Sequence, residues 1–158
     1  MNQDHQRLCA WAGVVGITFI VIGLFVMGFV PPIGPSLTPD QVAEIYRARA
    51  TEIRFGALLI IISAMFCAPY YAVIFLQLRR MEGKRPIGAY SQLGSGLANL
   101  QFFILPGVFF AIAGYRPDRS VDVLYALNDM AWLMTLFPWT VGAMQGICVG
   151  LAVLKHGT

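Results

Sequence analysis

The sequence has few charged residues, and this scarcity limits the kind of protein it can form. Charged side chains make up 12% of its 158 residues, and 58% of the residues are hydrophobic. Soluble domains carry roughly 25% charged residues. So much apolar surface cannot all be hidden in a water-soluble core of this size. We therefore expect lipid to be the solvent for much of the chain.

Cysteine and histidine are also scarce, and neither occurs in a functional arrangement. The three cysteines, Cys9, Cys67 and Cys148, lie far apart in apolar runs. A disulfide or a zinc site needs closer pairs or clusters, so we interpret these thiols as buried and unreactive. Both histidines, His5 and His156, are near the ends of the chain. Their position removes the usual metal ligand and general base from the apolar regions and argues against bis-histidine haem ligation.

Several further absences narrow the function. No acidic or basic residue lies in the middle of a long apolar run, whereas proton-coupled transporters need an ionisable group there. The chain has no C-x-x-C pair for thiol redox chemistry and no nucleophile beside a histidine base. Its basic residues are scattered, while a nucleic-acid surface needs a basic stripe. We expect no catalytic residue, metal ion, cofactor or nucleic-acid partner.

Four apolar segments are long enough to cross a bilayer, which takes about 20 helical residues. We place them at 8–30, 55–78, 93–115 and 130–154. The first is longer than the apolar region of a cleaved signal peptide and runs into VPPIGPS without a cleavage site. The sequence therefore predicts an all-α protein, a four-helix transmembrane bundle in which residues 1–158 form one domain.

The distribution of basic residues predicts the orientation. Six basic and two acidic residues fall on the side of the two termini, against five basic and six acidic residues on the other side. The segment RRMEGKRP, at 79–86, carries four of those six basic residues. Because basic loops stay in the cytoplasm, we expect both termini to be cytoplasmic. The predicted location is the inner membrane of a bacterium.

Two helix-start signals lie in the predicted outer loops. Thr38 has the properties of an N-cap, with Pro39 at the first helical position and Gln41 at the capping-box position. Ser120 is a second N-cap candidate, followed by Asp122 in the first turn. We expect each helix to begin outside the membrane and to continue, with or without a bend, into the second or the fourth span.

Small residues four positions apart form one face of a helix and let another backbone approach closely. The fourth span carries such a set at Gly142, Gly146 and Gly150. The second span carries a matching set at Ala64, Ala68 and Ala72. Both sets begin at nearly the same predicted depth on spans that run in the same direction. We expect them to pack together; the competing partner of the glycine set is a second copy of the chain.

Polar residues within the predicted spans need partners, because each costs free energy when it faces lipid. Five of them are candidates for a binding site: Tyr70, Tyr71, Asn99, Gln101 and Gln145. One interpretation is hydrogen bonding between helices, and the other is a cavity that recognises a polar group on a lipid-soluble ligand. Near the outer ends of the second and fourth spans, Arg54 and Asp129 would form an ion pair if these spans touch. The alternative is that each is solvated separately.

These features favour a non-catalytic polytopic membrane protein. The first hypothesis is an accessory or structural subunit of a homo- or hetero-oligomeric membrane assembly, with membrane lipids and a protein partner or a second copy around it. The alternative is a binder or carrier of a small lipid-like molecule within the helix bundle. An enzyme is the third and least supported possibility. No motif in the sequence is typical of a particular family.

Overall fold

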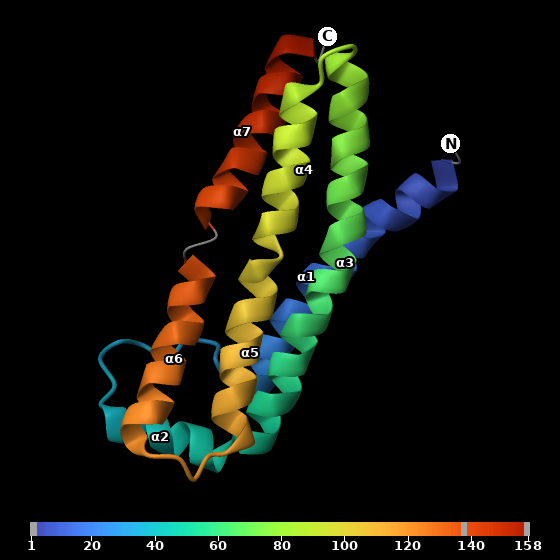
Figure 1. Cartoon of the computed structure of the whole chain (residues 1–158). Helices are drawn as coiled ribbons and strands as arrows, with labels where there is room; N and C mark the ends of the chain where they lie inside the picture. The colour runs from blue at the N-terminus through green and yellow to red at the C-terminus, as the bar shows by residue number, and fades with distance from the viewer. Residues whose placement is uncertain (1–2, 137–138, 157–158) are drawn as a thin grey trace.

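The computed structural model describes residues 3–136 and 139–156, of which 86% are helical and none lies in a strand. Seven helical segments follow one another along the chain: α1 (Gln3–Met27), α2 (Pro39–Ala48), α3 (Ala50–Glu82), α4 (Ile87–Asn99), α5 (Gln101–Tyr115), α6 (Val121–Leu136) and α7 (Trp139–His156). Both termini lie toward the end of the molecule opposite α2 (Figure 1).

Four helical stretches are long and apolar enough to cross a membrane: Gln3–Met27, Ala50–Glu82, Ile87–Tyr115 and Val121–His156. The prediction of an all-helical chain with four such helices is confirmed. These helices extend beyond the apolar segments expected at 55–78, 93–115 and 130–154, because they continue into polar residues. Helix α1 covers residues 3–27, so it starts before the apolar segment expected at 8–30 and ends three residues before the end of that segment.

The end of α1 has a clear local cause. Gly28 adopts a φ of +71°, which side chains with a Cβ rarely adopt. Its N–H donates to the carbonyl of Phe25 (2.9 Å), and the N–H of Phe29 donates to the carbonyl of Leu24 (3.0 Å). These two bonds form a Schellman motif. Arg49 Nη2 donates to the carbonyl of Val26 (3.3 Å) and so places a cation at the helix C-terminus.

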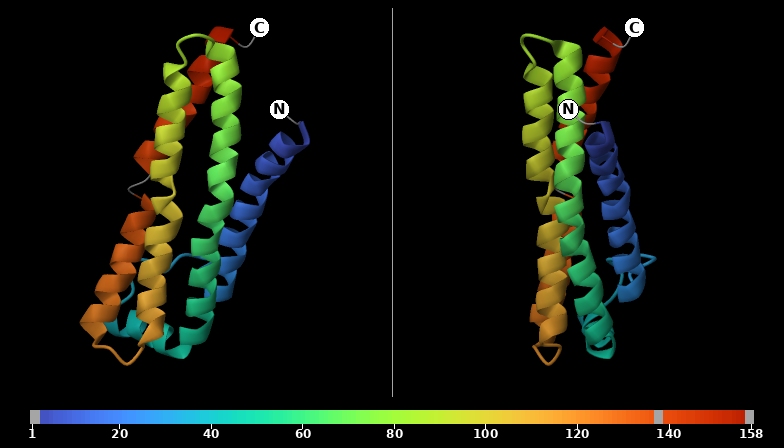
Figure 2. Two further views of the ribbon diagram at one scale, coloured as in Figure 1. Left: turned by 45° about the vertical axis from the view of Figure 1, so that its right-hand side comes forward. Right: turned by 90° about the vertical axis from the view of Figure 1, so that its right-hand side faces the viewer.

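Helix α2 lies across one end of the molecule and covers it (Figures 1 and 2). The predicted capping box is present: Gln41 N–H donates to the Thr38 hydroxyl, and Thr38 N–H donates to the Gln41 side chain. However, α2 and α3 are two helices that meet at Arg49 rather than one extended helix. Helix α2 packs mainly against α6. Helix α6 begins directly after Ser120, the second candidate N-cap.

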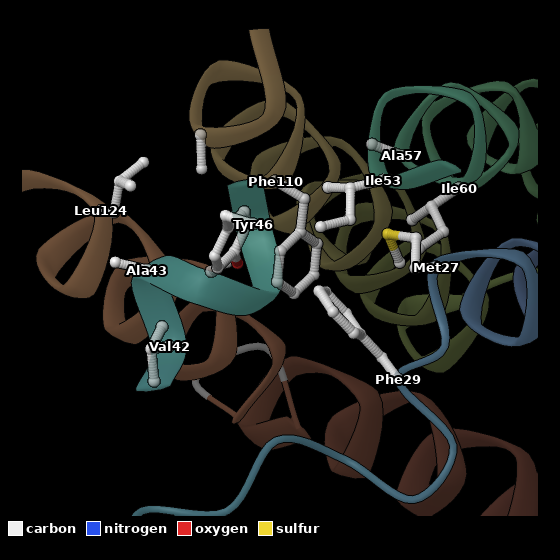
Figure 3. Packing of buried hydrophobic residues seen from close by; sticks show 12 residues of the cluster. Met27, Phe29, Val42, Ala43, Tyr46, Ile53, Ala57, Ile60, Phe110 and Leu124 are labelled. Carbon is white, nitrogen blue, oxygen red and sulfur yellow. The ribbon is translucent and has the colours of Figure 1, made fainter. Parts of the chain in front are cut away.

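The largest apolar cluster lies near the α2 end. Figure 3 shows Phe29 and Phe110 close to Tyr46 of α2. The rings of Phe29 and Phe110 are 5.2 Å apart, and Phe110 and Trp132 are 5.5 Å apart. Among the described residues, two smaller clusters lie farther along the helices toward the termini. The core is therefore concentrated at one end, because α2 closes that end with buried apolar side chains.

The long helices follow one another as neighbours in a row. Helix α1 packs against α3, α3 against α4 and α5, α5 against α6, and α4 against α7. Contact between α1 and the α6–α7 stretch is slight among the described residues. The first and fourth candidate spans therefore leave space between them, and this space forms part of the candidate site.

Glycines bring α1 and α3 together at close range. A Cβ on Gly23 would lie 2.8 Å from the carbonyl oxygen of Gly56, and a Cβ on Gly16 would lie 3.2 Å from that of Ser63. Each pair of positions is seven residues apart on its own helix, and the two helices run in opposite directions. Toward its N-terminus α1 leans away from α3 (Figure 2, left).

Candidate functional site

Three of the five predicted polar residues come together between α3, α4 and α7. Asn99 Nδ2 donates to the hydroxyl of Tyr71 over 3.3 Å. Gln145 approaches the same place from α7: a Cβ on Gly96 would lie 2.5 Å from its Nε2 and 2.8 Å from the Tyr71 ring. Glycine at position 96 therefore leaves the room in which these side chains meet.

The other two predicted residues lie elsewhere. Tyr70 is directed toward α1, where a Cβ on Gly13 would lie 2.8 Å from its ring. Gln101 is exposed at the start of α5. The five residues therefore do not line one cavity. The reason is angular, since neighbouring residues point about 100° apart around a helix, so Tyr70 and Tyr71 serve different interfaces.

Gln92 lies one turn before Gly96 on α4 and was not predicted. Its side chain is fully buried, and neither its Nε2 nor its Oε1 has a hydrogen-bond partner among the described residues. Gln145 Nε2 is buried and unpartnered as well. The predicted third span began at residue 93 and so excluded Gln92. The usable signal was its spacing, because Gln92, Gly96 and Asn99 recur four and three residues apart on one helix face.

An apolar groove lies where the first and fourth candidate spans fail to meet. Its volume is about 450 Å³, and it takes side chains from α1, α3, α5, α6 and α7. Its walls include Leu24, Ile60, Phe103, Phe110, Trp132 and Trp139. The indole Nε1 of Trp132 is buried without a hydrogen-bond partner among the described residues.

A second cavity, of about 420 Å³, continues this groove toward the polar cluster. It shares Phe102, Phe103 and Trp139 with the first cavity and reaches Asn99 and Gly142. Asn99 thus forms the polar end of an otherwise apolar passage. The arrangement can accommodate a slender apolar molecule that carries a hydrogen-bonding group.

The predicted contact between the two small-residue sets is not made within the chain. Nothing lies within 4 Å of a Cβ placed on Gly146 or Gly150, and the nearest side chain to Gly142 is Asn99, at 3.9 Å. Helix α7 packs chiefly against α4, with Cys148 and Ala152 buried on that face.

The alanines of α3 are divided among different surroundings. Ala64 is buried in a cluster with Phe103, Ala68 is half-buried, and Ala72 is exposed. The prediction of their contact with α7 assumed that the second and fourth spans are neighbours. In the structure the third stretch supplies most of the packing surface of the fourth, and α3 packs most extensively against α1.

The predicted ion pair between Arg54 and Asp129 is also absent from the described residues. Arg54 bonds within its own helix, donating from Nε to the carbonyl of Ala50 (3.2 Å) and from Nη2 to the Thr51 hydroxyl (3.1 Å). Asp129 lies near Tyr46, whose hydroxyl donates to Asn128 Oδ1 over 3.2 Å. Burial, and to a lesser extent the charge of Asp129, raises the pKa of Tyr46 far above its ordinary value.

No group of three metal-ligating side chains occurs in the described parts of the chain. No protein-family model matches the chain, and comparisons with curated proteins and with solved structures found no similar protein. The function is therefore inferred from the geometry of these helices.

Proposed function

We propose that this chain is a non-catalytic membrane protein that serves as a subunit of a larger membrane assembly, built from its own copies or from other proteins. The observation that carries the proposal is the uncovered glycine edge of α7, formed by Gly146 and Gly150. Its position next to, and not on, the face that packs against α4 makes it available to another helix.

The surroundings of this edge support the proposal. In the fourth candidate span 12% of the most apolar stretch is buried, against 33% in the third. Large apolar side chains on α7, such as Met144, Ile147 and Leu151, are exposed beside the glycines. Helices in lipid associate mainly through close packing, and small residues permit it. A partner helix seated on Gly146 and Gly150 would complete the packing that α7 lacks within its own chain.

The proposal includes an orientation and a location. Both termini face the cytoplasm, and the protein resides in the inner membrane of a bacterium. The basic segment at 79–86 lies at the end of the molecule that carries both termini, and basic loops favour the cytoplasmic side. Helix α2 then covers the outer end.

A matched pair of glycine substitutions tests the assembly. Gly146→Leu should split the complex purified in mild detergent, because its side chain fills the space reserved for the partner backbone. Gly94→Leu is the control, since Gly94 also has open space around it but lies on α4. Mass measurement of the purified species and identification of co-purifying proteins report the result. A wild-type chain that is monomeric and free of partners contradicts the proposal, as does equal behaviour of the two variants.

The second candidate function is a binder or carrier of a lipid-like molecule, favoured by the apolar groove that ends at Asn99. We expect the molecule's apolar chain to lie along Phe103 and Trp132 and its polar group to bond to Asn99. Native mass spectrometry of the purified protein should detect a bound lipid that Asn99→Leu loses. Gln101→Leu, which alters an exposed amide two residues away, should retain it. Retention by both variants contradicts this function.

A further inference from the structure

A third cavity, an open cleft, lies between α1 and α3 at the end of the molecule opposite α2. Its volume is about 460 Å³, and it is separate from the apolar groove. It occurs where α1 leans away from α3 (Figure 2). Arg7 enters it from α1 and Arg80 from α3, above a floor that includes Ala10 and Val73. Two helices far apart in sequence therefore present one guanidinium each to the same cleft.

The two arginines have no anionic partner within the described structure. Neither guanidinium takes part in a hydrogen bond or an ion pair among the described residues. A glutamine pair crosses the cleft beside them, with Gln77 Nε2 donating to Gln6 Oε1 over 3.1 Å. Two like charges that face a shared cleft repel each other, so an anion between them lowers the electrostatic free energy of this end.

We propose that this cleft binds the phosphate headgroup of an anionic membrane lipid. Guanidinium groups match phosphate oxygens in geometry and form strong, charge-assisted hydrogen bonds with them. Basic pockets between membrane helices on the cytoplasmic side are suited to anionic headgroups. The inference rests on the proposed membrane insertion and orientation. It depends neither on the partner helix at α7 nor on the apolar groove.

The position of the arginines selects a lipid over free phosphate. Arg7 directly precedes the first apolar run, and Arg80 follows the last apolar residues of the second. Both guanidinium groups therefore lie at the depth of the headgroups when the two helices cross the membrane. Exposed apolar side chains continue along α1 from this point, beginning with Leu8 and Trp11, and provide a surface for acyl chains.

The bound headgroup would also join two helices where their direct packing ends. The close glycine contacts of α1 with α3 lie at Gly13, Gly16 and Gly23, all farther from the N-terminus than Arg7. Beyond them α1 diverges. A phosphate held by Arg7 and Arg80 together bridges this divergence, so the lipid acts as a structural ligand of the α1–α3 pair.

Neighbouring arginines provide a matched test. The wild-type chain and three variants, Arg7→Gln, Arg80→Gln and Arg79→Gln, are titrated with phosphatidylglycerol or phosphatidylcholine and examined by native mass spectrometry. Arg79 is exposed, as Arg7 and Arg80 are, but it does not line the cleft. We expect one phosphatidylglycerol bound selectively by the wild type and by Arg79→Gln. Its affinity should fall about tenfold or more in the two cleft variants, because each loses a charge-assisted bond.

Each other result contradicts the proposal in a different way. Equal losses in all three arginine variants would indicate general attraction to negative lipids and no cleft site. Displacement of the lipid by millimolar inorganic phosphate would assign the cleft to free phosphate. A wild-type chain that enters vesicles but shows no preference for phosphatidylglycerol refutes the cleft alone. A folded, helical wild-type chain that does not enter vesicles refutes membrane insertion as well.

Discussion

At the residue scale, glycine has opposite consequences on different helices of this chain. Between α1 and α3, glycine permits contact, because the carbonyl oxygens of Gly23 and Gly56 occupy the space that a Cβ would need. On α7 the space beside Gly146 and Gly150 is open. The four-residue spacing of the α7 glycines therefore did not indicate a contact within the chain. The seven-residue spacing of the contact positions on α1 and on α3 marks where these two helices meet.

The α1–α3 contact gives the first prediction. Gly56→Ala places a Cβ about 2.5 Å from the carbonyl oxygen of Gly23, which forces the two backbones apart. Overpacking of this kind costs about 1–3 kcal/mol. The free energy of unfolding, measured by denaturant titration in mixed micelles, should fall accordingly. The control, Gly94→Ala, should not lower it, because Gly94 has nothing within 4 Å of its Cβ position and alanine favours the helix. Equal effects of the two changes would show that the close contact is absent.

At the element scale, α2 is held by both apolar and polar contacts. Val42, Ala43 and Tyr46 are fully buried beneath it. Arg47 donates from Nε to the carbonyl of Pro117 (3.2 Å) and from Nη2 to that of Arg119 (3.3 Å), which ties α2 to the α5–α6 connection. The helix is thus a fixed cover of its end of the molecule.

Removal of one buried hydroxyl should loosen this cover. Tyr46→Phe keeps the ring but leaves Asn128 Oδ1 without its donor, at a cost of about 1–3 kcal/mol. Amide hydrogen exchange across residues 39–48 should become faster, while exchange in α5 changes little. Tyr115→Phe serves as the control, because Tyr115 is 66% exposed. Unchanged exchange in α2 would mean that apolar burial alone holds the helix.

The same tyrosine predicts how α2 responds to alkaline pH. Burial raises the pKa of Tyr46 far above its ordinary value, so the folded state favours the neutral phenol. The stability this adds is fully present below pH about 10, the pKa in an unfolded chain, and is lost as the pH rises toward the folded-state pKa. In an absorbance titration Tyr46 should therefore ionise only together with α2 opening. Ionisation of Tyr46 near pH 10 with α2 still docked would contradict this assignment.

At the scale of the whole molecule, the two ends differ. The α2 end contains the main apolar cluster and the Arg49 bond to the end of α1, whereas α1 leans away from α3 toward the other end (Figures 1 and 2). One end is closed by α2, and the other carries the basic segment at 79–86. This polarity agrees with a membrane protein whose two ends face different compartments.

Cysteine labelling tests the proposed orientation. In a variant whose three native cysteines are replaced by alanine, Ser36→Cys and Lys84→Cys introduce thiols at exposed positions near opposite ends. A membrane-impermeant maleimide applied to intact cells should label Ser36→Cys but not Lys84→Cys, and permeabilised cells should show labelling of both. The reverse pattern would place the termini outside, and labelling of both in intact cells would contradict insertion across the membrane.

The all-helical class and the four membrane-length helices were predictable because they depend on local properties. Apolar runs, the Thr38 capping box and the helix start after Ser120 lie within short stretches of sequence. Hydrogen bonding between helices was one of the two interpretations of the polar residues in the spans, and Asn99 forms such a bond with Tyr71. Gln92 was missed because it lay one residue outside the assumed limit of the third span.

The sequence by itself determined which segments are helices and which of their residues cannot remain in contact with lipid alone. Tertiary structure decided which helices are neighbours. It therefore decided that the glycine edge is uncovered, that Arg54 and Asp129 do not pair within the described residues, and that Tyr70 is directed toward α1. The physical reason is that an apolar helix face packs about equally well against any of several other apolar faces. Depth along a span is encoded locally, whereas the choice of neighbour depends on how all the helices fit together.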